Sequence, residues 1–337
     1  MIALDANGAD GGPRVVAEGA RRARTAVLAF GPAAELEGLA HVVDAPRYVS
    51  SDEQPLDALR ARPDASIAMA ARAVGEGRAE ALVSAGHTGA TLAASLDHIG
   101  RLEGVTRAAL AVLLPSASGS PTLLLDAGAG LRADAPQLAG FAHLGAAFMR
   151  AAEGFERPRV ALLSVGIEAG KGTREVIDAG RELARSPLRF VGNVEGGDVL
   201  AGSADVIVCD GFTGNVALKA FEGAARLVLG GVRDALSSGA RAALGGLLAR
   251  PTLRALAARL DPDAHGGAIL LGLRRPVVVA HGASSADGVA SAIALARRAV
   301  DERMVERTAA ELVAAGVQSV PVASVAPGSA RGSRNSS

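Results

Sequence analysis

The sequence is poor in the residue types on which several kinds of site depend. Its 337 residues include one cysteine, seven phenylalanines, one tyrosine and no tryptophan. A single cysteine excludes a disulfide framework and a cysteine-based structural zinc site. Because Cys209 follows the apolar run Val206–Val208, we interpret it as a buried structural residue rather than a catalytic thiol. So few aromatic rings argue against a surface that stacks nucleic-acid bases.

Surplus charge and long apolar runs are also missing. The 35 cationic and 35 anionic side chains balance, which argues against general nucleic-acid binding. No uninterrupted apolar run approaches the roughly 18 residues that a membrane-spanning helix needs. The first residues, MIALDANGADGG, lack the basic and apolar regions of a signal peptide. Together with the lone cysteine, these absences predict a cytoplasmic protein.

Lysine is scarce, although cations are not. Only Lys171 and Lys219 are lysines, and the other cations are arginines. An ammonium group is a compact charge that the planar guanidinium group of arginine does not replace. Since both lysines lie in glycine-rich surroundings, we interpret them as candidates for function, with chance retention as the alternative.

Short apolar runs alternate with longer amphipathic stretches, which predicts an α/β fold with a mostly parallel sheet. The expected strands are Ile2–Asp5, Ala26–Phe30, His41–Val43, Ala81–Ser84, Ala109–Leu114, Thr122–Asp126, Val160–Ser164, Arg189–Val191, Val206–Asp210 and Pro276–Ala280. The expected helices are Gly12–Arg24, Ser66–Gly75, Thr88–Ile99, Pro136–Ala152, Thr173–Ala184, Asn215–Val232 and Ser285–Arg303. We expect residues 1–320 to form a single domain. Residues 321–337, rich in Pro, Gly and Ser, are predicted to be a disordered tail.

The segment Ser237–Leu260 interrupts the α/β alternation. Its leucines recur at helical spacing with arginines between them, and Pro251 is expected to divide it into two helices. A basic amphipathic pair of this kind can lie on an anionic membrane surface. The alternative is a helical hairpin that packs on the body of the protein or on a second subunit, and the segment alone favours packing.

Glycine-rich polar turns follow six of the expected strands. They are Asp5–Pro13, Ser84–Ala90, Asp126–Gly130, Ser164–Thr173, Gly192–Asp198 and Cys209–Asn215. Glycine lets backbone N–H groups approach an anion, and a helix N-terminus adds partial positive charge. Because ligands bind beyond the carboxyl ends of parallel strands, we expect these turns at one edge of the sheet, forming a phosphate or oxyanion site. None of the turns is a Walker A or dinucleotide motif.

These turns carry the candidate site residues. The candidate catalytic residues are Lys219, Asn215, Lys171 and His281. The candidate binding residues are Asp5, Gly8, Gly86, His87, Thr88, Gly89, Asn193, Glu195, Asp210, Thr213 and Gly214. Carboxylates are scattered singly, so no metal site and no cofactor is predicted. A site of amide donors and lysine without a covalent nucleophile suits direct attack by bound phosphate on an acyl carbonyl.

At these residues the sequence resembles the bacterial phosphate acyltransferase family of phospholipid synthesis. The matching segments occur in the family order over about residues 1–300. They are IALDANGADGGP, LVSAGHTGATLAAS, LLLDAGAG, FVGNVEGGDVLAGSADVIVCDGFTGNVALKAFEG and GGAILLGLRRPVVVAHGASS.

The resemblance implies a fold, a reaction and partners. The fold would be a three-layer αβα sandwich like those of phosphotransacetylases and isocitrate or isopropylmalate dehydrogenases. The reaction would convert long-chain acyl-acyl-carrier-protein and inorganic phosphate into acyl phosphate, which feeds acylation of glycerol 3-phosphate. The protein would be a homodimer. It would touch the inner face of the membrane peripherally, through a projecting amphipathic helix pair at Ser237–Leu260.

The sequence departs from the family motifs in turns that we expect to face the ligand. Those motifs usually read DAMGGDxxP, SAGNTGA, arginine after NVEG, and GGAPLLG. The departing residues are Asn7, Ala9, Gly11, His87, Gly197 and Ile269. Two alternatives therefore stay open beside the main hypothesis. One is a short-chain phosphate acyltransferase that uses acyl-coenzyme A, and the other is a weakly active paralogue that binds acyl carrier protein.

Overall fold

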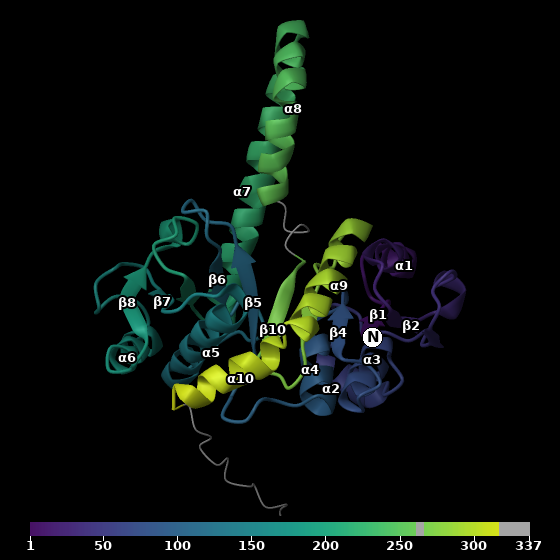
Figure 1. The fold of residues 1–337 in the computed structure, drawn as a ribbon, viewed down its shortest axis with the longest axis horizontal. Coiled ribbons are helices and arrows are strands. Elements are labelled where there is room, and N and C mark those ends of the chain that lie inside the picture. The colour runs from purple at the N-terminus through teal and green to yellow at the C-terminus, as the bar shows by residue number, and fades with distance from the viewer. Residues whose placement is uncertain (261–265, 317–337) are drawn as a thin grey trace, which may run out of the picture.

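A computed structural model describes residues 1–260 and 266–316, so the predicted tail at 321–337 lies outside the described residues. Eleven strands form a sheet in the order β3-β2-β1-β4-β11-β10-β5-β6-β9-β7-β8 (Figure 1). The strands are β1 (Ile2–Asp5), β2 (Val27–Gly31), β3 (Val42–Asp44), β4 (Ala81–Ser84), β5 (Ala109–Leu114), β6 (Thr122–Leu125), β7 (Arg159–Leu163), β8 (Arg189–Val194), β9 (Val206–Val208), β10 (Ala268–Leu271) and β11 (Val277–Val279).

The described helices include all those that the sequence predicts. They are α1 (Gly12–Ala23), α2 (Pro55–Ala61), α3 (Ser66–Gly75), α4 (Thr88–His98), α5 (Ala135–Glu153), α6 (Arg174–Leu183), α7 (Gly211–Ser237), α8 (Ala240–Leu260), α9 (Ala286–Asp301) and α10 (Met304–Ala314). The predicted strands are present with bounds within three residues. The strand β10 and the helices α2 and α10 were not predicted.

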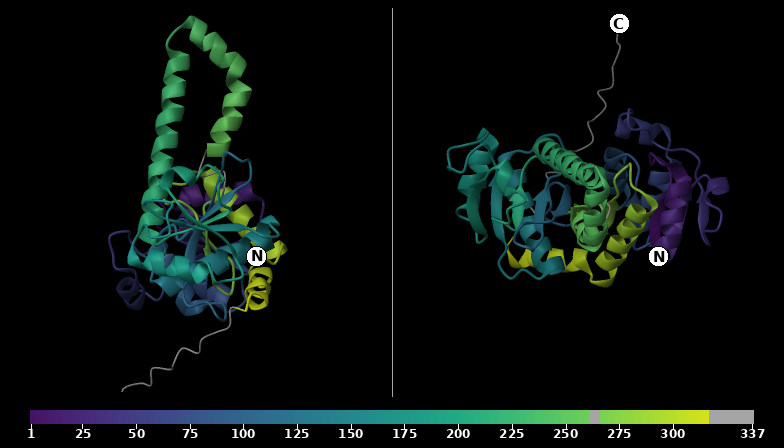
Figure 2. Two further views of the ribbon diagram at one scale, coloured as in Figure 1. Left: turned by 90° about the vertical axis from the view of Figure 1, so that its left-hand side faces the viewer. Right: turned by 90° about the horizontal axis from the view of Figure 1, so that it is seen from above.

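Helices cover both faces of the sheet, which confirms the three-layer αβα sandwich (Figure 2). Buried side chains join α1, α5, α6, α9 and α10 to one face and α2, α3, α4 and α7 to the other. The central strands are almost entirely buried, and their side chains alternate between the two layers, as expected for a sheet covered on both sides. The core therefore lies on both faces of the sheet.

The strands do not all run in the same direction, which corrects the expectation that six turns share one edge. The pairs β11–β10, β10–β5 and β5–β6 are antiparallel, whereas the other pairs are parallel. As a result β6, β7, β8 and β9 run opposite to β1, β4 and β11. The turns after β6, β7, β8 and β9 thus lie at the opposite edge from those after β1, β4 and β11. The short connection between β5 and β6 causes the reversal, because seven residues permit a hairpin but no crossover.

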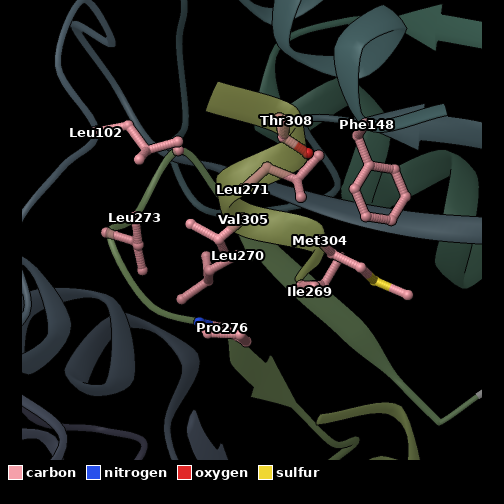
Figure 3. Close-up of a pocket in the computed structure, with 11 residues that line it drawn as sticks. Leu102, Phe148, Ile269, Leu270, Leu271, Leu273, Pro276, Met304, Val305 and Thr308 are labelled. Carbon is pink, nitrogen blue, oxygen red and sulfur yellow. The ribbon is translucent and has the colours of Figure 1, made fainter. Parts of the chain in front are cut away.

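A small apolar void lies beneath α10 (Figure 3). It has a volume of about 10 Å³ and is lined mostly by aliphatic side chains, among them Leu271, Met304 and Val305. Such a volume holds at most one water molecule. The void is therefore a gap in side-chain packing and offers no room for a substrate.

The helices α7 and α8 form a hairpin that projects from the body of the protein (Figures 1 and 2). The expected division of Ser237–Leu260 at Pro251 is wrong. The helix α8 is continuous with Pro251 inside it, and the break between helices falls before Ala240. Proline at 251 removes the hydrogen bond to the carbonyl of Leu247. Both residues are exposed, so water can bind that carbonyl, and packing on α7 supports the helix.

The exposed side chains of the hairpin are unusual for a protein surface. Leu227 and Leu248 are 78% and 77% exposed, and Leu244 and Leu247 are also exposed. None of the helices in residues 1–260 and 266–316 combines the length and apolar character that a membrane crossing needs.

Candidate functional site

A cavity of about 500 Å³ lies on the sheet face between α4 and α7. Leu110, Val112 and Ala268, on the neighbouring strands β5 and β10, line the cavity on its sheet side. Further apolar side chains line it, including Leu218 and Phe221 of α7. The cavity thus has a long apolar surface along β5, to which a few polar groups are added.

The turn between β4 and α4 supplies one polar wall. Gly86, His87 and Thr88 line the cavity there. His87 is the N-cap of α4, and its Nδ1 accepts a hydrogen bond from the N–H of Ala90 at 3.2 Å. This wall is therefore formed by a helix N-terminus, where an anion is stabilised.

A network of buried hydrogen bonds supports this turn. Asp5 Oδ2 accepts a hydrogen bond from Ser84 Oγ at 2.7 Å, and that hydroxyl accepts the N–H of Gly86 at 3.1 Å. Burial raises the pKa of Asp5 to about 6, against the opposing effect of its hydrogen bonds. Asp5 lines a small adjoining pocket with Gly86 and His87 but does not line the main cavity. It positions the turn rather than facing a ligand.

The opposite wall is the face of α7 that carries Asn215, Lys219 and Glu222, which are spaced by four and three residues. Lys219 Nζ donates to Glu222 Oε2 at 2.9 Å and lies 2.5 Å from His281 Nε2. Glu222 is only 7% exposed, and its Oε2 is 3.7 Å from His281 Nε2. The carboxylate of Glu222 thus holds the ammonium group of Lys219 and the ring of His281 close together at this wall.

His281 reaches this cluster from the turn after β11. The carbonyl of Gly282 accepts a hydrogen bond from the N–H of Asp10 at 2.9 Å, which joins this turn to the turn after β1. Asp10, His281 and Gly282 all line the cavity. The turns after β1 and β11 thus meet at one edge of the sheet.

Asp126, in the turn after β6, supports the cavity without lining it. Its carboxylate accepts the N–H groups of Leu110, Gly128, Ala129 and Gly130, and burial raises its pKa. The first turn of α7 packs directly on this loop.

The start of α7 shows why glycine is needed there. A Cβ atom at Gly214 would lie 1.9 Å from the carbonyl oxygen of Asp126, so any larger residue would push the helix away. Asp210 caps the helix by accepting the N–H of Thr213 at 2.7 Å. Asp210, Thr213 and Gly214 thus set the position from which Asn215 and Lys219 reach the cavity.

Three candidates lie apart from the cavity, in the loops after β7 and β8. Asn193 Nδ2 donates to the carbonyl oxygens of Glu168 at 3.0 Å and Lys171 at 3.4 Å. The N–H of Glu195 donates to Asp198 Oδ2 at 2.9 Å. Lys171, Asn193 and Glu195 do not line the cavity; their loops follow β7 and β8, the last two strands at one end of the sheet.

Two glycine candidates support the polar wall without lining the main cavity. Gly8 has a φ angle of 84°, in the left-handed region that favours glycine, and packs against Gly86. Gly89 leaves room for the imidazole of His87, because a Cβ atom there would lie 2.8 Å from the ring carbon Cε1. Both positions therefore shape the turn that carries His87.

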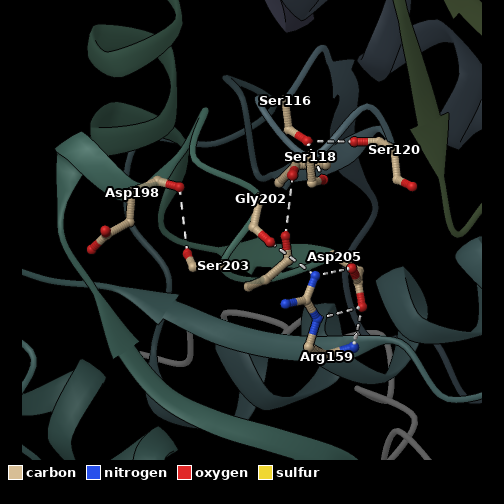
Figure 4. Close-up of polar contacts among 10 residues, drawn as sticks. Ser116, Ser118, Ser120, Arg159, Asp198, Gly202, Ser203 and Asp205 are labelled. Carbon is tan, nitrogen blue, oxygen red and sulfur yellow. Dashed lines mark hydrogen bonds and ion pairs between the residues drawn. The ribbon is translucent and has the colours of Figure 1, made fainter.

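A polar network beside the cavity joins β7 to β9 (Figure 4). Arg159 Nη2 donates to Asp205 Oδ1 at 2.7 Å and to the carbonyl oxygen of Gly202 at 2.9 Å. Although burial opposes ionisation, the hydrogen bonds and charge of Arg159 hold the pKa of Asp205 below its usual range. The loop that contains Gly202 is thereby fixed to the sheet.

Hydrogen bonds between serine residues stabilise the turn between β5 and β6, in the same region (Figure 4). Ser116 Oγ lies 2.7 Å from Ser118 Oγ and donates to the carbonyl oxygen of Ser120 at 2.6 Å. The adjacent Pro115 and Leu200 line the cavity. Hydrogen bonds therefore hold both of the loops that border this end of the cavity.

The structure adds one residue that sequence reasoning missed and confirms another prediction. Glu222 was not singled out, although its spacing of three residues from Lys219 on a helix was visible. Cys209 is buried as predicted, and burial raises the pKa of its thiol well above the usual value.

Within the described residues, no group of three or more His, Cys, Asp or Glu side chains is placed to hold a metal ion.

Comparison with known proteins identifies the family. The family model of the fatty acid synthesis proteins matches residues 1–307. The phosphate acyltransferase of Heliobacterium modesticaldum is 43% identical over 319 residues, which cover 90% of this chain and 95% of the relative. The phosphate acyltransferase of Thermobifida fusca is also 43% identical, over 91% of this chain and 89% of the relative. The chain belongs to the phosphate acyltransferase family.

Solved structures show how the fold of this phosphate acyltransferase relates to others. A phosphotransacetylase from Streptococcus pyogenes has a TM-score of 0.58 at 19% identity, covering 89% of this chain and 94% of its own. A 4-hydroxythreonine-4-phosphate dehydrogenase from Klebsiella pneumoniae has a TM-score of 0.53 at 15% identity, covering 89% and 99%. These similarities confirm the predicted phosphotransacetylase-like and dehydrogenase-like fold.

Proposed function

We propose that the protein transfers a long-chain acyl group from the thioester of acyl carrier protein to inorganic phosphate. The products are acyl phosphate, which feeds acylation of glycerol 3-phosphate, and free carrier protein. One observation carries the proposal: a single cavity combines an aliphatic surface along β5 with anion-binding donors on one wall and Lys219 on the other. The relatives that are named phosphate acyltransferase support the same reaction class.

The geometry suggests how the two substrates are arranged. Phosphate binds at the N-terminus of α4, beside Gly86, His87 and Thr88, and the acyl chain lies along β5. A phosphate oxygen attacks the thioester carbonyl carbon, so that a C–O bond forms and the C–S bond breaks. Lys219 donates a proton to the departing thiolate, with Glu222 and His281 holding its ammonium group.

Asn215 completes the polar wall as an amide donor to the oxyanion that forms on the acyl carbon. Loss of one such donor typically costs about 3–4 kcal/mol of transition-state stabilisation. Proximity of the two bound substrates supplies much of the remaining rate enhancement. Lys171 lies outside the cavity, and no step of the reaction is assigned to it.

The test uses purified protein with palmitoyl-acyl carrier protein and palmitoyl-coenzyme A in separate reactions, each with and without inorganic phosphate. Thiol release is followed, and acyl phosphate is trapped with hydroxylamine. We expect phosphate-dependent release from the carrier-protein thioester, reduced at least 100-fold in Lys219→Met. Release from the coenzyme A thioester alone would support the short-chain alternative. Binding of carrier protein without release would support the weakly active paralogue.

Two further features belong to this proposal. The hairpin carries exposed leucines together with Arg226, Arg233, Arg241, Arg250 and Arg254. An amphipathic surface of this composition suits peripheral contact with anionic lipid at the inner face of the membrane, through Ser237–Leu260, for a protein that is otherwise cytoplasmic. The resemblance to the family also supports a homodimer.

A further inference from the structure

The cavity between α4 and α7 is polar at one end and apolar at the other. Much of its polar lining comes from the turns after β1, β4 and β11, where Asp10, His87 and His281 lie. The strands β4 and β5 are three positions apart in the sheet, which corresponds to about 14 Å. On the β5 side, Leu200 lines the cavity and packs against the apolar cluster that contains Leu114. The apolar end of the cavity therefore lies well away from most of its polar groups.

Two loops that are hydrogen-bonded to each other form the apolar end. Pro115 directly follows β5, Leu200 lies in the segment before β9, and both line the cavity. The N–H of Ala117 donates to the carbonyl oxygen of Leu200 at 2.8 Å. This hydrogen bond joins the two loops beside the side chains that line the cavity.

Further contacts fix the same two loops (Figure 4). In the first loop, Ser116 Oγ donates to the carbonyl oxygen of Ser120 at 2.6 Å. In the second, Arg159 Nη2 donates to the carbonyl oxygen of Gly202 at 2.9 Å. A Cβ atom at Gly202 would lie 2.5 Å from Ser118 Oγ, so the loops are also packed closely together. Because several hydrogen bonds hold both loops, the apolar end of the cavity is a rigid boundary.

We propose that Leu200 and Pro115 form an end wall that limits the length of the acyl chain. The inference rests on the proposed function and adds the residues that select among acyl donors. The acyl chain passes Val112 on β5 and ends against Leu200 and Pro115. Each methylene group that is buried changes binding about fourfold, so affinity rises with chain length until the chain reaches the wall. We call the chain length at which this rise stops the limiting length.

The strand β5 provides a scale for the limiting length. Val112 and Leu114 line the cavity two residues apart, which corresponds to about 7 Å. An extended alkyl chain advances about 1.3 Å per carbon atom, so about five carbon atoms fit between these positions. A bulky residue at 112 should therefore stop the chain earlier than a bulky residue at the end wall.

Two substitutions at Leu200 should move the limiting length in opposite directions. Leu200→Ala removes three carbon atoms at the apolar end, so the limiting length should rise by about two carbons or more. Leu200→Phe should lower it by about two carbons. The affinity for even-chain fatty acid carboxylates, from octanoate to eicosanoate, is measured by titration calorimetry. Hydroxylamine trapping gives kcat/KM for the corresponding acyl-acyl-carrier proteins.

A third variant and a control test the scale. Val112→Phe should lower the limiting length by about five carbons relative to Leu200→Phe. Leu131→Ala is the matched control, because Leu131 is 76% exposed and does not line the cavity. Its limiting length should equal that of the wild type. Leu200 is only partly buried, so both of its variants should fold, and their melting temperatures check this.

The two readouts separate this inference from the proposed function. If the wild type forms no acyl phosphate but the Leu200 variants shift the limiting length for fatty acids, the proposed function fails and the end wall stands. If acyl phosphate forms and a folded Leu200 variant keeps the limiting length of the wild type, the end wall is overturned. It is also overturned if the wild type binds no fatty acid, or if Leu131→Ala shifts the limiting length as Leu200→Ala does.

Discussion

Among single residues, Glu222 decides how charge is held beside the cavity. Its buried carboxylate contacts Lys219 and lies near His281, with Asp10 in the adjoining turn. We expect Glu222→Gln to lower kcat at least tenfold, because the ammonium group of Lys219 loses the carboxylate that holds it beside the cavity. Steady-state rates measure this effect.

The exposed Glu306 on α10 provides the matched control for this experiment. Glu306→Gln should leave kcat unchanged. An equal kcat in Glu222→Gln and the wild type would show that Glu222 does not hold Lys219 for the reaction.

Asp5 should make the stability of the protein depend on pH. Its pKa is about 6 in the folded protein and 3.8 in the reference state, so the folded chain holds the proton more tightly. The free energy of unfolding therefore falls as the pH rises from about 4 to about 6, by about 3 kcal/mol for this group. Asp126, whose pKa is also raised by burial, acts in the same direction. Asp5→Asn should remove the contribution of Asp5, as measured by denaturant unfolding at each pH.

The comparison that isolates Asp5 is the difference between the wild type and Asp5→Asn at each pH. Asp57→Asn, at an exposed position on α2, should track the wild type throughout. The prediction would be wrong if the wild type and Asp5→Asn lost stability equally between pH 4 and pH 7.

Part of the candidate site was predictable residue by residue. His87, Lys219 and His281 were identified because each stands in a glycine-rich turn or just beyond one, and they line one cavity. Glu222 was missed because a carboxylate on a helix is usually solvated, and its burial depends on the packing of α7 against a distant turn. Lys171 was singled out by the scarcity of lysine and by its glycine-rich turn, and neither says where its loop lies relative to the cavity.

Among the elements, the α7–α8 hairpin should be separable from the cavity. We expect the double substitution Leu247→Glu and Leu248→Glu to abolish binding to vesicles that contain anionic lipid. Burial of one leucine contributes about 1.5–3 kcal/mol, so the double change should weaken binding at least 100-fold. Sedimentation with vesicles measures the binding, and hydroxylamine trapping should show unchanged transfer from soluble acyl-carrier protein.

Two other variants complete the hairpin experiment. Val313→Glu alters an equally exposed apolar residue on α10, far from the hairpin in sequence, and should bind vesicles like the wild type. Arg250→Glu with Arg254→Glu should weaken binding to anionic vesicles more than to neutral ones. If the leucine variant still sedimented with anionic vesicles, the hairpin would not be the membrane contact.

The predictions of helix and strand positions that were wrong have local explanations. Pro251 predicts a break, but the carbonyl that it leaves without a partner is reachable by water, and α8 also contacts α7. The strand β10 follows two glycines and pairs antiparallel with both neighbours, so it does not fit the βα alternation that was used to place the other strands. The local sequence pattern thus located the strands that follow the βα alternation and missed β10, which does not follow it.

At the scale of the whole molecule, the reversal of the sheet was the principal failure. The α/β class and the layers follow from the alternation of strands and helices, and the structure confirms them. The spacing between β5 and β6 already contained the missing signal, because a seven-residue loop such as PSASGSP cannot hold a crossover helix. The reversal places the turns that precede Lys171 and Lys219 at the edge opposite to the turn that carries His87, and only Lys219 lines the cavity, because α7 carries it there.

The proposed homodimer is tested by the mass of the particle in solution. Light scattering during size-exclusion chromatography should give twice the chain mass of 33.6 kDa. The mass should stay at this value on dilution through the micromolar range, since a stable homodimer interface is large and apolar. A mass equal to that of one chain at micromolar concentration would contradict the proposal.

The helix α7 is one uninterrupted rod that carries Asn215, Lys219 and Glu222 near its base and the hairpin at its far end. The 18 residues from Lys219 to Ser237 span about 27 Å. A change in tilt at the tip is therefore transmitted to the base. If a surface bound at the tip and a substrate in the cavity favour different tilts of α7, binding at one site changes the free energy of binding at the other. Thermodynamic reciprocity then requires each to alter the affinity of the other by the same factor.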